Sequence, residues 1–356
     1  MRIFPGLPFG NGSDGDYSSA TIPTMTSRSC SGSFNSTTLG LSSAGFVNGD
    51  VLLIYQTRGS GAGNWEVNRI ISGGGTTSLT LLRELANSYT DSGSSQAQCI
   101  KVSQYANVTV QSGTWSLVDW DGDVGGILTF ACNGILTITG TISADSRGYR
   151  GGDGTVGSTP NYSGEGNNAT NLLDTGDTGG SGGGTGTGGG GGGNGTAGSN
   201  GQTAGTNGGD TAGSADLITA VLGGAGGGGS SANEANGDGG DGGGFVLIFV
   251  RDITITGGVS ASGGNGQSVQ AGGAGGGGAG GSVLIIAQTA TLGSNKITAS
   301  AGSGGDCTEN PRDGGAGGVG RISIHHSDTV TGTTSPTFND TTDGSLKVSG
   351  GNFVLI

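Results

Sequence analysis

Apolar side chains occur along this chain as short runs of strand length, and apolar residues at helical spacing are nearly absent. In the first 120 residues, clusters of Gly, Ser and Asn separate these runs at the spacing typical of an antiparallel sandwich or barrel. The runs lie at 51–55, 65–71, 78–82, 97–102 and 107–110. We therefore expect an antiparallel β domain over residues 1–120.

Beyond residue 120 the pattern becomes a repeat. Glycine pairs at 243–244, 280–281 and 317–318 recur at an interval of 37 residues, and each pair precedes an apolar segment. An earlier copy begins at Gly125 and Gly126. The apolar segments lie at 127–132, 245–250, 282–287 and 320–325. A fixed period of this length is typical of stacked repeat architectures.

A second segment of strand character closes the copies at 142–145, 259–262 and 297–300. Residues 137–143 and 253–256 alternate apolar residues with Thr, which predicts strands with one buried face. Such a unit cannot bury its apolar face alone, so the copies must stack on one another. The sequence therefore predicts an all-β protein with a parallel β-solenoid over 121–326, followed by a C-terminal strand segment at 327–356.

Glycine accounts for 86 of the 356 residues and is concentrated between the predicted strands. The largest insertion spans 151–244, and shorter glycine-rich excursions lie at 272–281 and 314–318. Glycine can form an extended left-handed helix with three residues per turn, and such helices pack closely where no Cβ intervenes. We expect stacked polyglycine-II-like excursions, with mobile loops as the alternative.

The charge balance excludes some classes of partner. The net charge is −13 and Lys plus Arg total only 13, so no basic stripe is present to neutralise nucleic-acid phosphates. No apolar stretch approaches the roughly 20 residues that span a bilayer, so we expect no membrane insertion. The first 12 residues lack the apolar centre of a Sec-type signal. We therefore expect release by another secretion route or by lysis, as for a virion protein.

Candidate chemistry is sparse. Asp119, Asp121 and Asp123 have the D-x-D-x-D spacing that opens an EF-hand loop, but Val124 and Phe130 occupy the positions of its glycine and bidentate glutamate. An EF-hand is therefore excluded, and a looser calcium site or a solvated turn remains. The predicted strands carry almost no acidic residues, so we expect neither enzyme activity nor a cofactor other than calcium.

The four cysteines show no metal-ligand spacing. We interpret them as buried thiols or as structural disulfides, whose three possible pairings the sequence does not distinguish. They are Cys30, Cys99, Cys132 and Cys307.

Three features together resemble the glycine-rich β-solenoid proteins of bacteria and tailed phages. They are the tract TITGTISADSRGYRGG at 137–152, the closing strands with their Gly-Gly-Ala-Gly-Gly links, and the opening FGNGSDGD at 9–16. The resemblance covers about residues 120–325 and that short leader. It implies a non-enzymatic surface, fibre or tail role, and some phage adhesins of related composition use layered glycine helices to display recognition loops.

Two functional hypotheses follow. The first is a structural subunit of a self-assembling extracellular filament, appendage or virion fibre, because an apolar terminal strand can pair with a neighbour's sheet edge. The residues of that assembly contact are Phe353, Val354, Leu355 and Ile356. The second is a receptor-binding adhesin on a phage tail tip or cell surface, whose glycine-rich loops contact a cell-surface glycan or protein.

Overall fold

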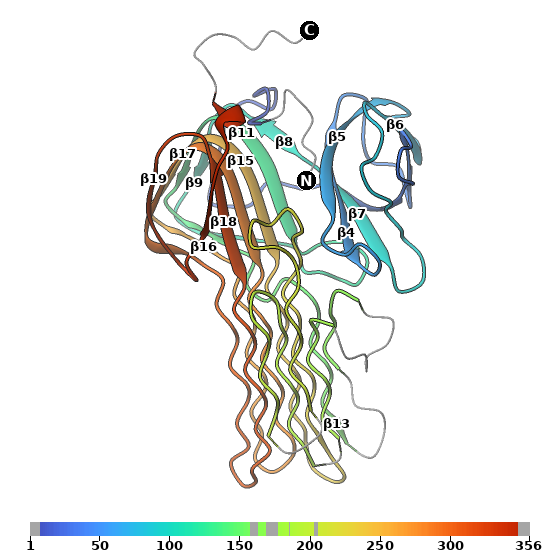
Figure 1. The fold of residues 1–356 in the computed structure, drawn as a ribbon, viewed down its shortest axis with the longest axis vertical. Helices are drawn as coiled ribbons and strands as arrows, with labels where there is room; N and C mark the ends of the chain where they lie inside the picture. Colours follow the sequence, from blue (N-terminus) through green and yellow to red (C-terminus); the bar gives the residue numbers. More distant parts are fainter. Residues whose placement is uncertain (1–7, 157–162, 169–176, 185, 203–205, 348–356) are drawn as a thin grey trace.

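The computed structural model describes residues 8–156, 163–168, 177–184, 186–202 and 206–347. In these residues the fold is almost entirely β, and the one short helical turn is η1 (Gly344–Leu346). No helix in the described ranges is long and apolar enough to cross a membrane. Figure 1 shows a barrel beside a curled sheet, with a long bundle of extended segments projecting from their base.

Residues 27–101 form a closed antiparallel barrel of six strands, in the order β2-β3-β6-β5-β4-β7. Strand β4 of this barrel is apolar at successive positions because both of its faces are buried. Leu52 and Ile54 lie in the barrel core, whereas Tyr55 packs toward the parallel sheet. The strands are β2 (Ser27–Ser31), β3 (Thr38–Leu41), β4 (Val51–Arg58), β5 (Trp65–Ser72), β6 (Ser78–Leu81) and β7 (Gln96–Lys101).

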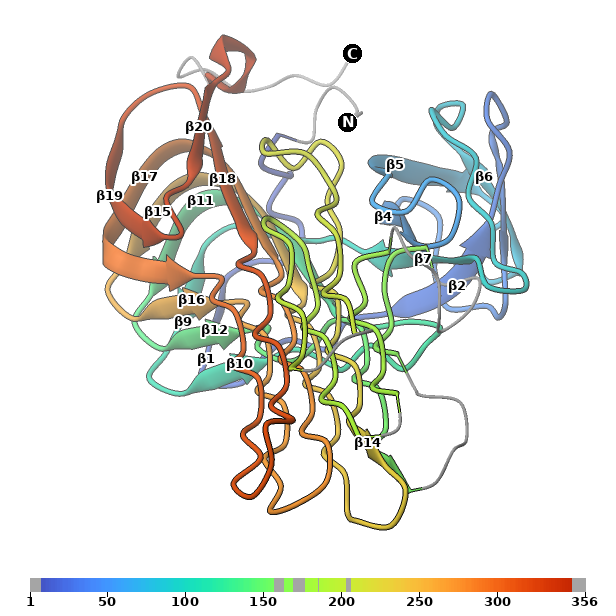
Figure 2. The same cartoon turned by 60° about the horizontal axis from the view of Figure 1, so that its bottom comes forward.

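A curled, 12-stranded sheet, all of whose strand pairs are parallel, packs beside the barrel (Figures 1 and 2). Its strands are β1 (Tyr17–Ser19), β8 (Ser103–Tyr105), β9 (Val108–Val110), β10 (Thr114–Ser116), β11 (Ile127–Ile138), β12 (Thr141–Ser143), β15 (Phe245–Ile255), β16 (Gly258–Ser260), β17 (Ser282–Thr298), β18 (Arg321–His326), β19 (Val330–Ser335) and β20 (Asn339–Thr342). A separate pair consists of β13 (Thr155–Val156) and β14 (Ser230–Ser231).

The strands that follow the glycine pairs are neighbours in this sheet. Phe245 pairs with Ile127 on one side and with Ser282 on the other, and Ser282 pairs with Arg321. Equivalent positions of successive repeats therefore lie in register. The sheet also includes β1 and β8–β10, from the region expected to be antiparallel. The alternation at 107–110 predicts a strand with one buried face, but it carries no information on the direction of the neighbouring strand.

Alternate side chains of the long strands enter two separate cores. Ile248 and Ile285 lie in the core inside the curl. Phe249 lies in the second core, between the sheet and the barrel, where the ring centroids of Tyr55 and Phe245 are 5.9 Å apart. The sheet is thereby held on both faces, which fixes the positions from which the glycine-rich segments leave it.

Candidate functional site

The candidate site is built on the glycine-rich segments between the strands of the sheet. We call these segments the glycine lattice and define it as residues 148–154, 163–166, 178–183, 188–202, 206–210, 221–229, 237–244, 261–267, 272–281, 299–305 and 314–320. They run side by side as extended chains, away from the sheet (Figures 1 and 2). Most of their residues belong to no regular strand.

Backbone hydrogen bonds in the run 188–193 change partner with a period of three residues. The donors and acceptors are Gly189 to Ala274, Gly192 to Gly277, Gly190 to Ser181, Gly193 to Thr178, and Gly191 to Ser199. One segment is thus bonded to three neighbours in three directions. The same neighbouring segment is therefore met again at every third residue of the run.

At many glycine positions where these segments meet, no side chain fits. A Cβ atom on Gly189 would lie 1.9 Å from the carbonyl oxygen of Gly227, and one on Gly275 would lie 1.9 Å from that of Asp238. Favourable contact between non-bonded carbon atoms requires about 3.5–4.0 Å. Since the obstructing atoms belong to the backbone, they cannot rotate away as a side chain would. Glycine at these positions is therefore a steric requirement of the lattice.

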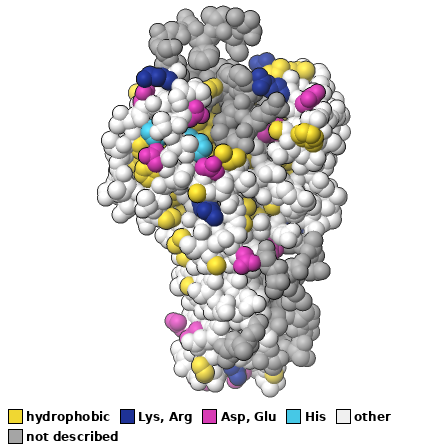
Figure 3. All heavy atoms as spheres, in the orientation of Figure 1, with side chains coloured by type: hydrophobic (Ala, Val, Ile, Leu, Met, Phe, Trp, Pro, Cys, Tyr) yellow, Lys and Arg dark blue, Asp and Glu magenta, His cyan; other side chains and the backbone are white. Residues whose placement is uncertain are grey.

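Polar side chains gather where lattice segments are connected at the end far from the sheet. We call residues 231–236, 268–271 and 306–313 the distal loops. Figure 3 shows charged side chains clustered at this lower end, whereas the visible wall of the lattice carries few of them. Charged side chains are thus sparse along the visible wall of the lattice and gather at its tip.

The distal loops are linked to one another by side chains. Arg312 Nη1 donates hydrogen bonds to Glu234 Oε2 and to the carbonyl of Ala271, each at 3.2 Å. Gln270 Nε2 donates to Glu309 Oε1 at 2.8 Å. The side chains of Arg312 and Glu234 are 28% and 43% exposed, so a solvent-facing ligand can reach both. The tip is an ordered polar surface with hydrogen-bonding groups of both kinds.

A buried carboxylate joins the lattice to the barrel, and the sequence pattern offered no signal for it. Glu165 accepts hydrogen bonds from Arg58 at 2.6 Å, from Arg150 at 2.7 and 3.0 Å, and from Trp120 Nε1 at 3.1 Å. Burial acts to raise the pKa of Glu165, but the hydrogen bonds and charges of Arg150 and Arg58 outweigh it and hold that pKa below its ordinary value. These partners come from distant parts of the chain, so only the fold brings them together.

The structure gives each carboxylate of the predicted calcium site a different partner. Asp119 forms an ion pair with Arg147, and Asp123 accepts a hydrogen bond from Ser29 Oγ at 2.5 Å. Asp121 Oδ1 accepts the backbone N–H groups of Asp123 and Val124, each at 2.8 Å, and so closes a local turn. In the described ranges, no group of three His, Cys, Asp or Glu residues is arranged to hold a metal ion.

All four cysteines lie in the described part of the chain, and all are free, buried thiols. The predicted structural disulfides are therefore not found. Cys30 and Cys99 lie in the barrel core and Cys132 in the core inside the curl, whereas Cys307 lies in a distal loop. Burial raises the pKa of Cys30 and of Cys132, which keeps both thiols protonated at neutral pH. They act as small apolar side chains.

The predicted assembly contact lies outside the described residues. It consists of Phe353, Val354, Leu355 and Ile356, whereas the structure describes the chain as far as Lys347. That prediction therefore stays open.

Comparisons with protein-family models, with curated proteins and with solved structures each found no match for this chain.

Proposed function

We propose that this chain is a non-enzymatic, extracellular recognition module that presents its distal loops to a receptor on a cell surface. The observation that carries this proposal is the difference between the interior of the glycine lattice and the loops at its tip. Its interior excludes side chains at the contacts between segments, while the loops at its tip carry charged and amide groups. Substitutions are tolerated best in such loops, so binding specificity is free to vary there.

The proposal includes a specific architecture. The sheet is a short β-solenoid, and each glycine-rich excursion leaves one rung and returns to begin the next. The excursions form a polyglycine-II-like bundle, which the three-residue hydrogen-bond period supports. Anchoring every excursion at both ends on a packed sheet keeps the tip in place although the bundle carries few apolar side chains.

The ends of the sheet favour recognition over end-to-end assembly. At the first rung, β1 pairs with β9 along Tyr17–Ser19. The backbone N–H of Asp14 donates to the carbonyl of Gln104 in β8 at 2.9 Å. At the last rung, β20 pairs with β18. β1 and β20 are themselves edge strands with one strand neighbour each, but they are only three and four residues long, and such short edges leave little backbone for pairing with another chain. Negative-stain images should therefore show separate particles, and regular filaments would favour a structural subunit instead.

A cell-binding experiment tests the role of the distal loops. The labelled full chain is titrated onto a panel of bacterial cells, beside a variant carrying Gln270→Ala and Glu309→Ala. A control variant carries Thr331→Ala and Thr333→Ala, at exposed positions of β19. We expect the loop variant to lose binding about tenfold or more, with its melting temperature unchanged, while the control binds as the wild type does. Equal binding by all three proteins would refute the proposal.

A further inference from the structure

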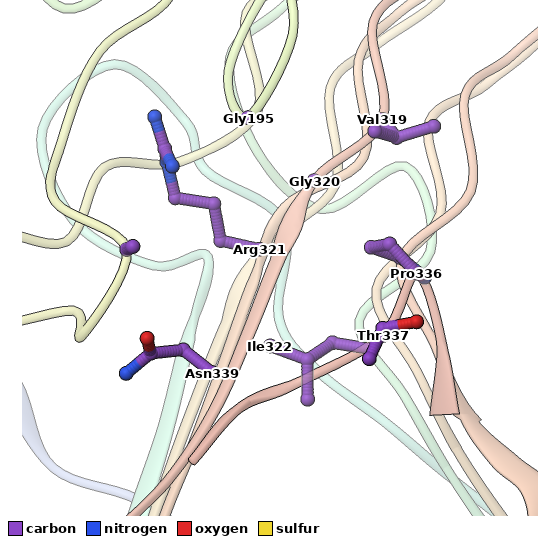
Figure 4. Close-up of a pocket in the computed structure, with 9 residues that line it drawn as sticks. Gly195, Val319, Gly320, Arg321, Ile322, Pro336, Thr337 and Asn339 are labelled. Atoms are coloured by element: carbon purple, nitrogen blue, oxygen red, sulfur yellow. The ribbon is translucent and has the colours of Figure 1, made fainter. Parts of the chain in front are cut away.

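A pocket of about 210 Å³ lies where the glycine lattice meets the last strands of the sheet. Figure 4 shows Arg321 and Asn339 on one side of it and Val319, Pro336 and Thr337 on the other. The pocket is remote from the distal loops, since it is formed at the start of β18 and by the connection between β19 and β20. It therefore calls for an explanation separate from receptor binding at the tip.

Among the described residues that line this pocket, Arg321 is the one that carries a charge. Its Nε donates to the carbonyl of Ala212 at 3.1 Å, and among the described residues no acceptor is bonded to its Nη groups. Arg312 and Arg251 each lie within 3.2 Å of a carboxylate, whereas no described carboxylate forms an ion pair with Arg321. Burial lowers the pKa of Arg321, and no charge on a described neighbour opposes that effect. Arg321 is thus a partly buried arginine that lines a pocket and has no ion-pair partner among the described residues.

We propose that this pocket is an oxyanion site, in which the Arg321 guanidinium binds the carboxylate or phosphate group of an acidic sugar. Arginine presents N–H donors in a planar fork that matches both groups and binds them through paired hydrogen bonds. An anion there would supply the counter-charge that no described residue provides. This proposal does not depend on the proposed receptor contact at the distal loops, and each can be tested without the other.

The other lining residues indicate the chemistry of the part of the ligand that carries no charge. Val319 and Pro336 offer apolar surface opposite the guanidinium, and the amide of Asn339 lies on the same side as Arg321 (Figure 4). Pockets for drug-sized ligands usually measure about 300–1,000 Å³, so this smaller pocket fits one sugar unit with its acidic group. A sugar ring presents C–H faces to apolar side chains and hydroxyl groups to an amide, which matches this arrangement.

Isothermal titration of the full chain with three probes tests the proposal. Glucuronate carries a carboxylate, glucose 6-phosphate carries a phosphate, and glucose carries neither. We expect saturable binding of at least one anionic probe, weakened by added salt, and none of glucose. The anion that binds more tightly identifies the natural group as carboxylate or phosphate. Failure of both anions to bind would overturn the proposal.

Two pairs of variants show whether Arg321 is responsible. Arg321→Gln should weaken anion binding about tenfold or more, the scale of lost charge-assisted hydrogen bonds. Arg251→Gln, which removes an arginine paired with Asp252, should leave binding unchanged. Ala215 is an exposed residue of the pocket lining, and Ala215→Glu places a competing carboxylate beside the guanidinium.

The Ala215 variants keep the test decisive if Arg321→Gln does not fold. Ala215→Glu should abolish binding of both anions, while Ala215→Gln, of nearly the same size but without charge, should retain it. Binding by Ala215→Glu equal to that of Ala215→Gln would refute the role of the guanidinium. Cell binding through the distal loops should be the same for both variants, so failure of this site is distinguishable from failure of the recognition proposal.

Discussion

The curled sheet and the glycine lattice are both densely packed, but they are packed by different atoms. In the sheet, apolar side chains such as Ile248 and Phe249 fill the cores on its two faces. In the lattice, the backbone of one segment lies directly against the backbone of the next, as at Gly275 beside Asp238. The first region is stabilised mainly by burial of apolar area. The second depends on hydrogen bonds and on the absence of side chains.

This difference explains why the glycine lattice depends on the sheet for its stability. Ordering one backbone residue costs roughly 1–2 kcal/mol of conformational entropy, and glycine loses the most freedom. A backbone hydrogen bond returns only about 0.5–1.5 kcal/mol net. Lattice segments alone are thus at best marginally stable. Their attachment to packed strands at both ends shortens the chain that must be ordered, so the sheet supports the lattice rather than the reverse.

The largest effect should come from adding one methyl group to the lattice. In Gly275→Ala the new Cβ would lie 1.9 Å from the carbonyl oxygen of Asp238, and the segments must separate. We expect a loss of about 3 kcal/mol or more in the free energy of unfolding, together with new protease cleavage in the lattice. Thermal unfolding and limited proteolysis measure both.

Gly258→Ala is the matched control, because the same group is added to a strand of the sheet. There the nearest atom to the new Cβ is the carbonyl oxygen of Lys296, at 3.6 Å. We expect a change within about 1 kcal/mol, partly offset by the reduced freedom of the unfolded chain. Equal effects of the two substitutions would mean that the lattice is loosely packed.

A smaller effect is expected at the junction between the lattice and the barrel. Glu165→Gln removes the charge that pairs with Arg58 and Arg150, and it should cost on the order of 2 kcal/mol at neutral pH. The cost is below that of a fully buried pair because the Arg150 side chain is 53% exposed. Urea unfolding at pH 7 measures the difference from the wild type.

The pH dependence of that difference identifies the charge as its cause. The folded pKa of Glu165 lies below its ordinary value of 4.5, so the carboxylate stabilises the fold fully above pH 4.5. That contribution is lost as the pH falls through the lowered pKa. The gap between wild type and Glu165→Gln should therefore narrow at acidic pH. A gap independent of pH would assign the effect to packing instead.

The repeat could be predicted from the sequence because it is encoded in local features. Glycine pairs at a fixed interval and apolar runs after them specify which strands are equivalent, and Phe245 and Ser282 indeed pair in register. The all-β character and the antiparallel strands of the barrel follow from alternation and turn residues for the same reason. Strand direction is not encoded in this way, which is why β8 to β10 joined the parallel sheet unexpectedly.

The site was less predictable because its contacts are tertiary. Glu165 is an isolated acidic residue in a glycine-rich stretch, and nothing nearby indicates that Arg58 will reach it. The surroundings of Arg321 are likewise set by the fold: its Nε donates to the carbonyl of Ala212, and no described carboxylate forms an ion pair with it. For the cysteines the sequence left buried thiols and disulfides open, and the structure shows free, buried thiols, with Cys132 and Cys307 in different parts of the fold.

Removing one methyl group from the sheet core should have a moderate effect. Ile248→Val leaves a small cavity among apolar side chains that can shift toward it, and we expect a cost of about 0.5–1.5 kcal/mol. Ile248→Val removes a methyl group from a core of side chains, whereas Gly275→Ala adds one where backbone packs on backbone. The pair of variants therefore compares the two kinds of packing directly. Calorimetry should give the sheet variant the higher melting temperature. The reverse order would contradict the proposed difference between the two regions.

The smallest effect on stability is expected at the tip, where neither kind of packing operates. Arg312→Ala removes an ion pair with Glu234 whose partners are 28% and 43% exposed, and such pairs contribute about 0–1 kcal/mol. A double-mutant cycle with Glu234→Ala should give a coupling energy in that range, smaller at high salt. A larger coupling would mean that the loop contact holds the lattice together. A small one leaves the tip free to change its chemistry while the glycine lattice beneath it stays intact.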